Sequence, residues 1–184
     1  MTVILQVVVI VVGVCLLVST IVLSWAKLRK QRQRSWHDLV ADLYSLELDE
    51  LHVVASDYLN PICGQITLEA DEIWEIVGGY EGLKKMCENA TIMLDLAAHA
   101  QRWNYLEASV VTERMRHDAV ILRGAVLRVE LGLLSGRMMK RFQVALPIRT
   151  QEAAAAYFLM RQRLLSLYEC CNSDLYPSLA NALQ

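Results

Sequence analysis

Two pairs of acidic and histidine residues are the closest approach to a chemical site in this sequence. Glu113 and His117 are four positions apart, and so are Asp95 and His99. Residues four apart share one face of an α-helix, so each pair can hold a metal ion together or pass a proton between its members. If the two helices pack antiparallel, the pairs come close to each other and form a speculative ligand or metal site.

Other interpretations of these pairs stay open. Glu113 and His117 fall on an apolar row of their segment, which also suits a buried, mutually bonded pair, and simple solvated side chains are a further interpretation. The Glu-x-x-His spacing of di-iron bundles and the His-Glu-x-x-His zinc motif are both missing from the sequence. Glycine-rich phosphate loops and the nucleophile motif of hydrolases are missing as well. We therefore assign no catalytic residue, metal or cofactor from motifs, and whether the protein is an enzyme stays open.

The elements around these residues begin with a long apolar run. Residues 1–26 carry no charged side chain, and residues 3–26 include nine valines and three isoleucines. As a helix, these 24 residues extend roughly 36 Å, enough to cross a hydrocarbon core of about 30 Å with some tilt. In lipid the backbone must satisfy its own hydrogen bonds, so a single span is a helix despite the β-branched composition. We predict a transmembrane anchor over residues 1–26.

A cleaved secretory signal is the competing interpretation of this run. Ser24 and Ala26 offer the small residues that a cleavage site after Ala26 requires. However, no basic residue precedes the run, and the run is longer than the usual 7–15 apolar residues of a signal peptide. An uncleaved anchor is therefore preferred over an exported domain.

A basic collar over residues 27–34 follows the run and predicts its orientation. Five of the 18 basic residues and no acidic residue lie in this segment. Positive residues beside a membrane span stay in the cytoplasm, so the N-terminus is expected outside and the C-terminal domain inside. Anionic lipid headgroups are possible contacts of the collar, and an aromatic side chain precedes it at the expected lipid interface. The predicted membrane-interface residues are Trp25, Lys27, Arg29, Lys30, Arg32 and Arg34.

The charge of the remaining chain argues against nucleic-acid binding. Residues 35–184 carry 13 basic and 20 acidic residues. The first part of this region, residues 35–99, has 13 acids and two bases, whereas residues 100–184 have seven acids and eleven bases. An acidic domain without a basic stripe does not suit a phosphate backbone. Two oppositely charged halves of one helical domain, or a polar binding surface on one half, both fit the division.

Hydrophobic periodicity predicts helices throughout residues 35–172. Asn60 and Pro61 are expected to end one segment, and Gly78, Gly79 and Gly82 to break the next. Three apolar faces follow from the spacing. The first helix places Trp36, Leu39, Val40 and Leu43 on one face. A helix over residues 82–104 has the apolar face Leu83, Cys87, Ala90, Leu94, Ala97 and Gln101. A last helix, from Thr150 to about Cys171, has the apolar face Ala153, Tyr157, Met160, Leu164 and Leu167.

The longest predicted helix covers residues 106–144 and closes at Pro147. Two rows of residues repeat along it every seven positions, and we expect them to form its buried seam. Gly132 and Gly136 indicate close packing against a neighbouring helix. The rows are Leu106, Glu113, Val120, Leu127 and Leu134, and Val110, His117, Gly124, Leu131 and Met138.

Two shorter segments resemble each other. Residues 45–58 and 67–80 align without gaps at an offset of 22, and Leu51 and Val54 correspond to Ile73 and Ile76. Each segment starts with a hydroxyl residue that is a good helix cap and continues with acidic residues. Two short helices with the same start chemistry, or a duplicated helical unit, both account for the similarity.

These observations predict an all-α protein with one N-terminal transmembrane helix followed by a soluble, antiparallel, bundle-like domain of about five or six helices. The expected divisions are an anchor over residues 1–26, a collar over 27–34, a helical domain over 35–172 and a tail over 173–184. We expect a single-pass membrane protein whose cytoplasmic domain is an interaction or scaffold module, with a protein partner or self-association through exposed helical seams. The alternative is a membrane-tethered ligand- or metal-binding protein, possibly enzymatic, that uses the region of Glu113 and His117.

Overall fold

The computed structural model describes residues 34–60, 68–135 and 140–183. The chain divides into two compact units, residues 1–35 and 36–184. The described residues of the second unit form seven α-helices and no β-strand, which confirms the all-helical prediction. The helices are α2 (Trp36–Ala41), α3 (Leu48–Leu59), α4 (Ala70–Ile76), α5 (Gly79–Ala100), α6 (Tyr105–Ser135), α7 (Lys140–Cys171) and α8 (Tyr176–Ala182).

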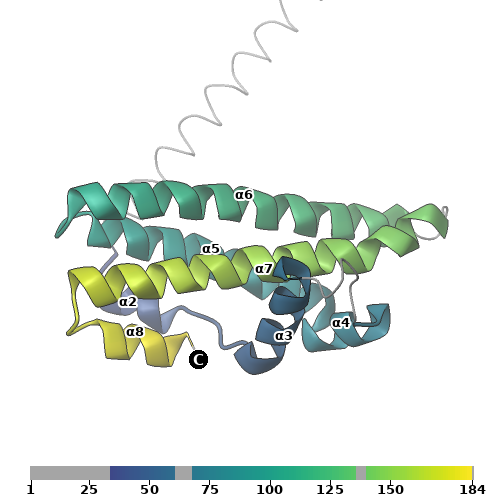
Figure 1. Cartoon of the computed structure of the whole chain (residues 1–184), viewed down its shortest axis with the longest axis horizontal. Helices are drawn as coiled ribbons and strands as arrows, with labels where there is room; N and C mark the ends of the chain where they lie inside the picture. The colour runs from purple at the N-terminus through teal and green to yellow at the C-terminus, as the bar shows by residue number, and fades with distance from the viewer. Residues whose placement is uncertain (1–33, 61–67, 136–139, 184) are drawn as a thin grey trace, which may run out of the picture. The chain divides into compact units, whose positions relative to one another are not determined.

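Three long helices form the body of this unit, and the short helices cover one side of it (Figure 1). A four-residue connection joins α5 to α6, so these helices run antiparallel as close neighbours. Helix α6 packs against α5 and α7, whereas α7 also contacts α3, α4 and α8. In Figure 1, α6 therefore lies along the upper edge and α7 runs through the middle.

Helix α7 is enclosed on every side near its midpoint. Four consecutive alanines, residues 153–156, are all buried. Successive residues of a helix point about 100° apart, so four buried neighbours leave no face open to solvent. Small side chains at these positions let the surrounding helices approach closely. The predicted seam is confirmed, because Ala153, Tyr157, Met160, Leu164 and Leu167 are all buried.

Several predicted helix boundaries are confirmed. Helix α3 ends at Leu59, directly before Asn60 and Pro61. Helix α4 ends at Ile76, and α5 begins after Gly78, whose φ of 75° lies in the left-handed region that favours glycine. Gly82, which was also expected to break the chain, lies within α5, so that part of the prediction is wrong. Trp36 and Leu39 are buried as expected for the first helix, and Val40 and Leu43 pack against the same core.

The boundary between the last two long helices was predicted wrongly. Helix α6 ends at Ser135, and α7 begins at Lys140 and includes Pro147, which was expected to close the earlier helix. Proline removes one backbone donor from a helix interior, but packing can outweigh that loss. A β-carbon on Gly132 would lie 3.1 Å from Leu146 Cδ2, which confirms close packing at this end. Gly136 lies outside the described residues.

The two similar segments form helices that start at equivalent positions. Leu48 begins α3 and Ala70 begins α4, at the expected offset of 22 residues. The matched residues Leu51 and Ile73 are both buried. The predicted cap is wrong by two positions in α3, where Glu47 is the N-cap and makes no side-chain cap bond. The duplication itself stays a hypothesis.

The segment expected to be a tail contains a packed helix. Helix α8 buries Leu179, and Leu183 just beyond it is also buried. Arg161 Nε on α7 donates a hydrogen bond to the Leu183 carbonyl oxygen at 3.0 Å. Residues 176–183 are thus part of the folded unit. Two of their apolar side chains are buried and one backbone carbonyl oxygen accepts a hydrogen bond, and the sequence pattern did not predict these contacts.

Buried polar side chains join segments that lie far apart in the sequence. Asn89 on α5 is fully buried. Its Nδ2 donates to the Tyr44 carbonyl oxygen at 2.8 Å and to the Tyr157 hydroxyl at 3.1 Å, and its Oδ1 accepts from the Tyr44 backbone N–H at 2.8 Å. Near α8, Trp36 Nε1 donates to the Tyr168 hydroxyl at 3.0 Å, and that hydroxyl donates to the Leu96 carbonyl oxygen at 2.9 Å. These bonds specify where the N-terminal segments cross α5 and α7.

The buried tyrosines predict unfolding at alkaline pH. Burial raises the pKa of Tyr157 to about 12 and also raises the pKa of Tyr168. An unfolded tyrosine has a pKa of about 10, so stability is complete below pH 10 and falls as the pH rises from there towards 12. Ultraviolet absorbance of tyrosinate should show a late ionisation that coincides with loss of helical circular dichroism. The Tyr157→Phe/Tyr168→Phe variant should lack this late ionisation; early, complete ionisation in a folded protein would contradict the prediction.

Replacing glycine by alanine is predicted to have opposite effects on stability at two positions. A β-carbon at Gly82 would overlap the Val77 carbonyl oxygen, whereas a β-carbon at Gly124 has nothing within 4 Å. We expect Gly82→Ala to lower the free energy of unfolding by about 1–3 kcal/mol through backbone displacement. We expect Gly124→Ala to raise it by about 0.5–1 kcal/mol through helix propensity. Denaturant unfolding at low protein concentration measures both, and a change of the same sign in both variants would refute the assignment.

Candidate interaction surface

The residues of the speculative site lie apart from the buried core. Glu113 and His117 are exposed on α6, so their predicted place on a buried seam is wrong. Glu113 Oε2 accepts a hydrogen bond from Arg116 Nη1 at 2.9 Å, as an ordinary surface ion pair. Asp95 and His99 are half-buried on α5 and each has a contact with another group.

These four residues do not assemble into a metal centre. Within the part of the chain that the structure describes, no group of three or more His, Cys, Asp or Glu side chains can hold a metal ion. A pair of side chains four apart on one helix leaves most coordination positions to water or to a substrate. The positions of these four side chains therefore give no further support to the ligand- or metal-binding interpretation.

The seam of α6 was misassigned because this helix has apolar residues on two faces. The inward face is built largely from small or medium side chains, which pack tightly against α5 and α7. Thr112 and Asp118 are buried on this face as well. The buried apolar residues are Ala108, Met115, Ala119, Leu122, Ala125, Val126 and Val129. The larger leucines and valines of the seven-residue rows lie on the other face. The seven-residue repeat, which both faces keep, therefore did not distinguish the buried face from the exposed one.

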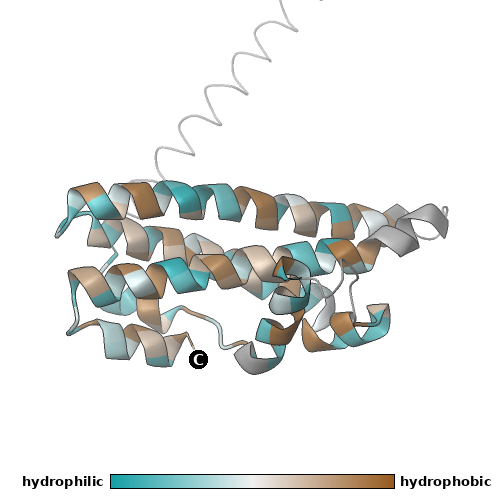
Figure 2. Ribbon diagram, viewed as in Figure 1, coloured by the Kyte–Doolittle hydropathy of each residue, from teal (hydrophilic) through white to brown (hydrophobic). Residues whose placement is uncertain are grey.

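The outward residues lie along one face of the helix, here called the α6 stripe. Its six apolar members are between 53% and 78% exposed. They follow the alternating spacing of three and four residues along about 42 Å of helix. The members are Leu106, Val110, Val120, Leu127, Leu131 and Leu134. Glu113, His117 and Gly124 occupy three further positions of the same two rows, and the last position, Met138, lies outside the described residues. Figure 2 shows brown apolar patches recurring along this helix.

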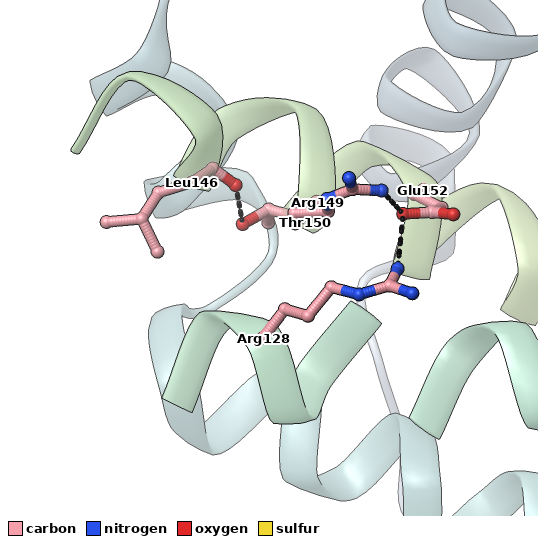
Figure 3. A network of polar contacts seen from close by, with 5 residues as sticks. All are labelled: Arg128, Leu146, Arg149, Thr150 and Glu152. Carbon is pink, nitrogen blue, oxygen red and sulfur yellow. Dashed lines mark hydrogen bonds and ion pairs between the residues drawn. The ribbon is translucent and has the colours of Figure 1, made fainter. Parts of the chain in front are cut away.

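Charged residues beside the stripe bond to the neighbouring helices. On one flank, Arg123 Nη2 donates to Thr91 Oγ1 of α5 at 3.0 Å. On the other flank, Arg128 Nη1 lies 3.7 Å from Glu152 Oε2 of α7 (Figure 3). Glu152 also accepts from Arg149 Nη1 at 2.6 Å, so two arginines converge on one half-buried carboxylate. Because these side chains bond to α5 and α7, they brace α6 from both sides.

A polar cleft is a second surface feature that no sequence motif indicated. Its volume is about 490 Å³, and it lies between the α2–α3 connection, α3 and the turn from α4 to α5. Its charged lining residues are Glu47, Glu75, Glu81 and Lys85. The carboxylates belong to the strongly acidic part of the domain, so the cleft is complementary in charge to a basic segment.

The described residues include only one of the predicted membrane-interface residues, Arg34. Trp25, Lys27, Arg29, Lys30 and Arg32 lie outside them, as does the whole apolar run. Arg34 is half-buried and has a contact within the chain. Among the helices that the structure describes, none combines the length and the hydropathy needed to cross a membrane.

Comparison of the chain with models of known protein families, with curated proteins and with solved structures gave no match. The surfaces of the molecule itself therefore provide the evidence about function.

The two faces of α6 predict very different responses to truncation of a leucine. Leu122 is fully buried and Leu127 is 54% exposed on the stripe. We expect Leu122→Ala to lower the free energy of unfolding by about 2–5 kcal/mol, and Leu127→Ala by less than about 1 kcal/mol. Denaturant unfolding of dilute protein measures the pair. A larger loss for Leu127→Ala than for Leu122→Ala would show that the heptad rows are the core after all.

Proposed function

We propose that this chain is a single-pass membrane protein whose cytoplasmic helical domain is an interaction module, and that the α6 stripe is its binding surface. The observation that carries the proposal is the exposure of six large apolar side chains at heptad spacing. Scattered apolar residues are common on protein surfaces, but several large apolar residues gathered on one helix face and edged by polar residues are typical of an interaction site.

The membrane part of the proposal is supported by the sequence. Residues 3–26 are uncharged and long enough to span a bilayer as a helix, and five basic residues follow them directly. That order favours retention of the collar, and hence of the domain behind it, in the cytoplasm. The collar also suits contact with anionic headgroups, at about 1 kcal/mol for each basic residue near the surface.

The interaction part is supported by the contrast between the two faces of α6. The inward face already supplies the packing that the domain needs, with small side chains against α5 and α7. The outward leucines and valines contribute little to that packing, yet they carry the larger apolar surface. A helix that is apolar on opposite faces is ordinarily covered on both, so the stripe is suited to a helical protein partner.

The alternative, ligand or metal binding around Glu113 and His117, has weaker support. Both side chains are exposed, and Glu113 already pairs with Arg116. In the proposed function they interrupt the apolar stripe and act on its specificity, since a charged group in a helical seam restricts which partners and registers are tolerated.

Membrane insertion and orientation are directly testable. We expect the full chain to stay in the membrane pellet at alkaline pH, and a variant lacking residues 1–26 to be released, because the apolar run supplies the insertion energy. A reporter fused after Arg34 and one fused at Gln184 should both be active in the cytoplasm.

Replacing the five collar bases by glutamine is the matched control for orientation, because it keeps the apolar run and removes the positive charge. This variant should insert with mixed orientation. Release of the unaltered chain at alkaline pH, cleavage after Ala26 shown by N-terminal sequencing, or an external reporter at Gln184 would each overturn the membrane part of the proposal.

A further inference from the structure

We infer that the partner of the α6 stripe is the α6 stripe of a second copy of this chain, and that the two helices pair antiparallel. This inference rests on the proposed interaction surface and names its occupant. It uses the period of the stripe, its area, the identity of its three interrupting residues and the charges on its flanks.

The period of the stripe indicates a helical partner. Nine positions from Leu106 to Leu134 alternate in steps of four and three residues, which is a repeat of 3.5. A straight helix has 3.6 residues per turn, so a strict 3.5 repeat keeps facing a neighbour only when two helices wind around each other. The stripe keeps this repeat through four heptads. The inward face of the same helix keeps it too, from Ala108 to Val129, and is covered by the helices α5 and α7.

The area of the stripe matches what a dimer requires. Fully burying a leucine or valine corresponds to about 60–120 Å² of apolar surface, at about 25 cal/mol per Å². The five stripe members that pair in the register described below, with half to three-quarters of that surface exposed, present about 150–450 Å² per copy. A standard interface buries about 800 Å² per partner, of which somewhat more than half is apolar. Two stripes therefore supply the apolar part of a small, specific interface.

The interrupting residues select the antiparallel arrangement. In a parallel pair in register, Glu113 would face Glu113 of the other copy, and Gly124 would face Gly124, which places two carboxylates together and leaves a hole in the seam. In an antiparallel pair, each layer joins one residue from each row. The layers are Leu106 with Leu131, Val110 with Leu127, Glu113 with Gly124, and His117 with Val120.

The absence of a side chain at Gly124 explains why this register is favoured. Glycine in the interior of a helix is less favourable than alanine. Nothing in the folded unit requires it here, because an added β-carbon would have no neighbour within 4 Å. Opposite Glu113 of the second copy, the missing side chain leaves room for the carboxylate to extend past the seam towards water.

The flanking charges favour the same arrangement. In the antiparallel register Glu107 of each copy lies beside Arg128 of the other, whose guanidinium also pairs with Glu152 of its own chain. This attraction occurs twice by symmetry. Arg116 comes near Arg123 of the other copy, but Arg116 already pairs with Glu113 of its own chain. A parallel pair would instead place Arg123 beside Arg128 and offer no opposite-charge pair in return.

The experiment compares the oligomeric state of the full chain, in a mild detergent, with that of two lysine variants. Sedimentation equilibrium of the unaltered chain should show a monomer–dimer equilibrium. The variant Leu127→Lys/Leu131→Lys should weaken dimerisation by at least about a hundredfold, since each leucine contributes about tenfold. Leu133→Lys is the matched control, because Leu133 is on the same helix and 44% exposed but lies off the stripe. This control should dimerise like the unaltered chain.

Two further variants test the arrangement of the pair. Glu113→Leu should tighten the dimer, because it removes a charge from the seam. Crosslinking with a short thiol-reactive linker should join two copies through Val120→Cys, which lies near the symmetry centre, and not through Leu134→Cys at the end of the helix. The unaltered chain, with its five native cysteines, gives the background.

The outcomes separate this inference from the proposed function. Dissociation by the stripe variant but not by Leu133→Lys, with crosslinking at the centre, supports the antiparallel dimer. A monomeric unaltered chain, equal effects of both lysine variants, or crosslinking at Leu134→Cys overturns it. If a monomeric chain in the membrane still binds a different protein and loses it in the stripe variant, the second copy is wrong while the proposed interaction surface stands.

Discussion

The enclosure of α7 is the constraint on which the rest of the described unit depends. Residues 153–156 are alanines buried on all sides, and no larger side chain at these positions would let α3, α4, α5 and α6 contact the same helix. Close packing around one helix leaves each surrounding helix with an inner face and an outer face. Helix α6 lies at the edge of this arrangement (Figure 1), so its outer face has no counterpart within the folded unit that the structure describes.

Buried polar groups fix the relative positions of the helices, because hydrogen bonds are directional and apolar packing is not. Asn89 joins the segment after α2 to α5 and α7. Gln151 Nε2 on α7 donates to Asp57 Oδ2 on α3 at 3.1 Å, and the same carboxylate oxygen accepts from the Leu68 backbone N–H at 3.4 Å. Each of these side chains would be strongly destabilising without its partners. They therefore specify one arrangement of short helices that contribute little apolar area of their own.

The two faces of α6 connect the fold to the proposed function. Small inward side chains allow α6 to lie close to its neighbours, and the larger leucines are left to face outward. Arg123 and Arg128 bond to α5 and α7, so they stabilise the position of the helix and form polar edges to the stripe. A membrane anchor would favour association of two copies further. Confinement to a surface raises their effective concentration, so a small interface is sufficient.

The sequence by itself determined the helical class, the breaks at Asn60 and Gly78, and the seam of α7, because local propensity and hydrophobic period carry that information. It also predicts the anchor and the collar, which lie outside the described residues except for Arg34. Tertiary structure alone decided which face of α6 is buried, that Pro147 lies within a helix, and that the last residues pack as α8. The physical reason is that burial depends on neighbours distant in the sequence: alanines and Gly132 form a core only where other helices approach, and leucines at heptad spacing stay exposed where none does.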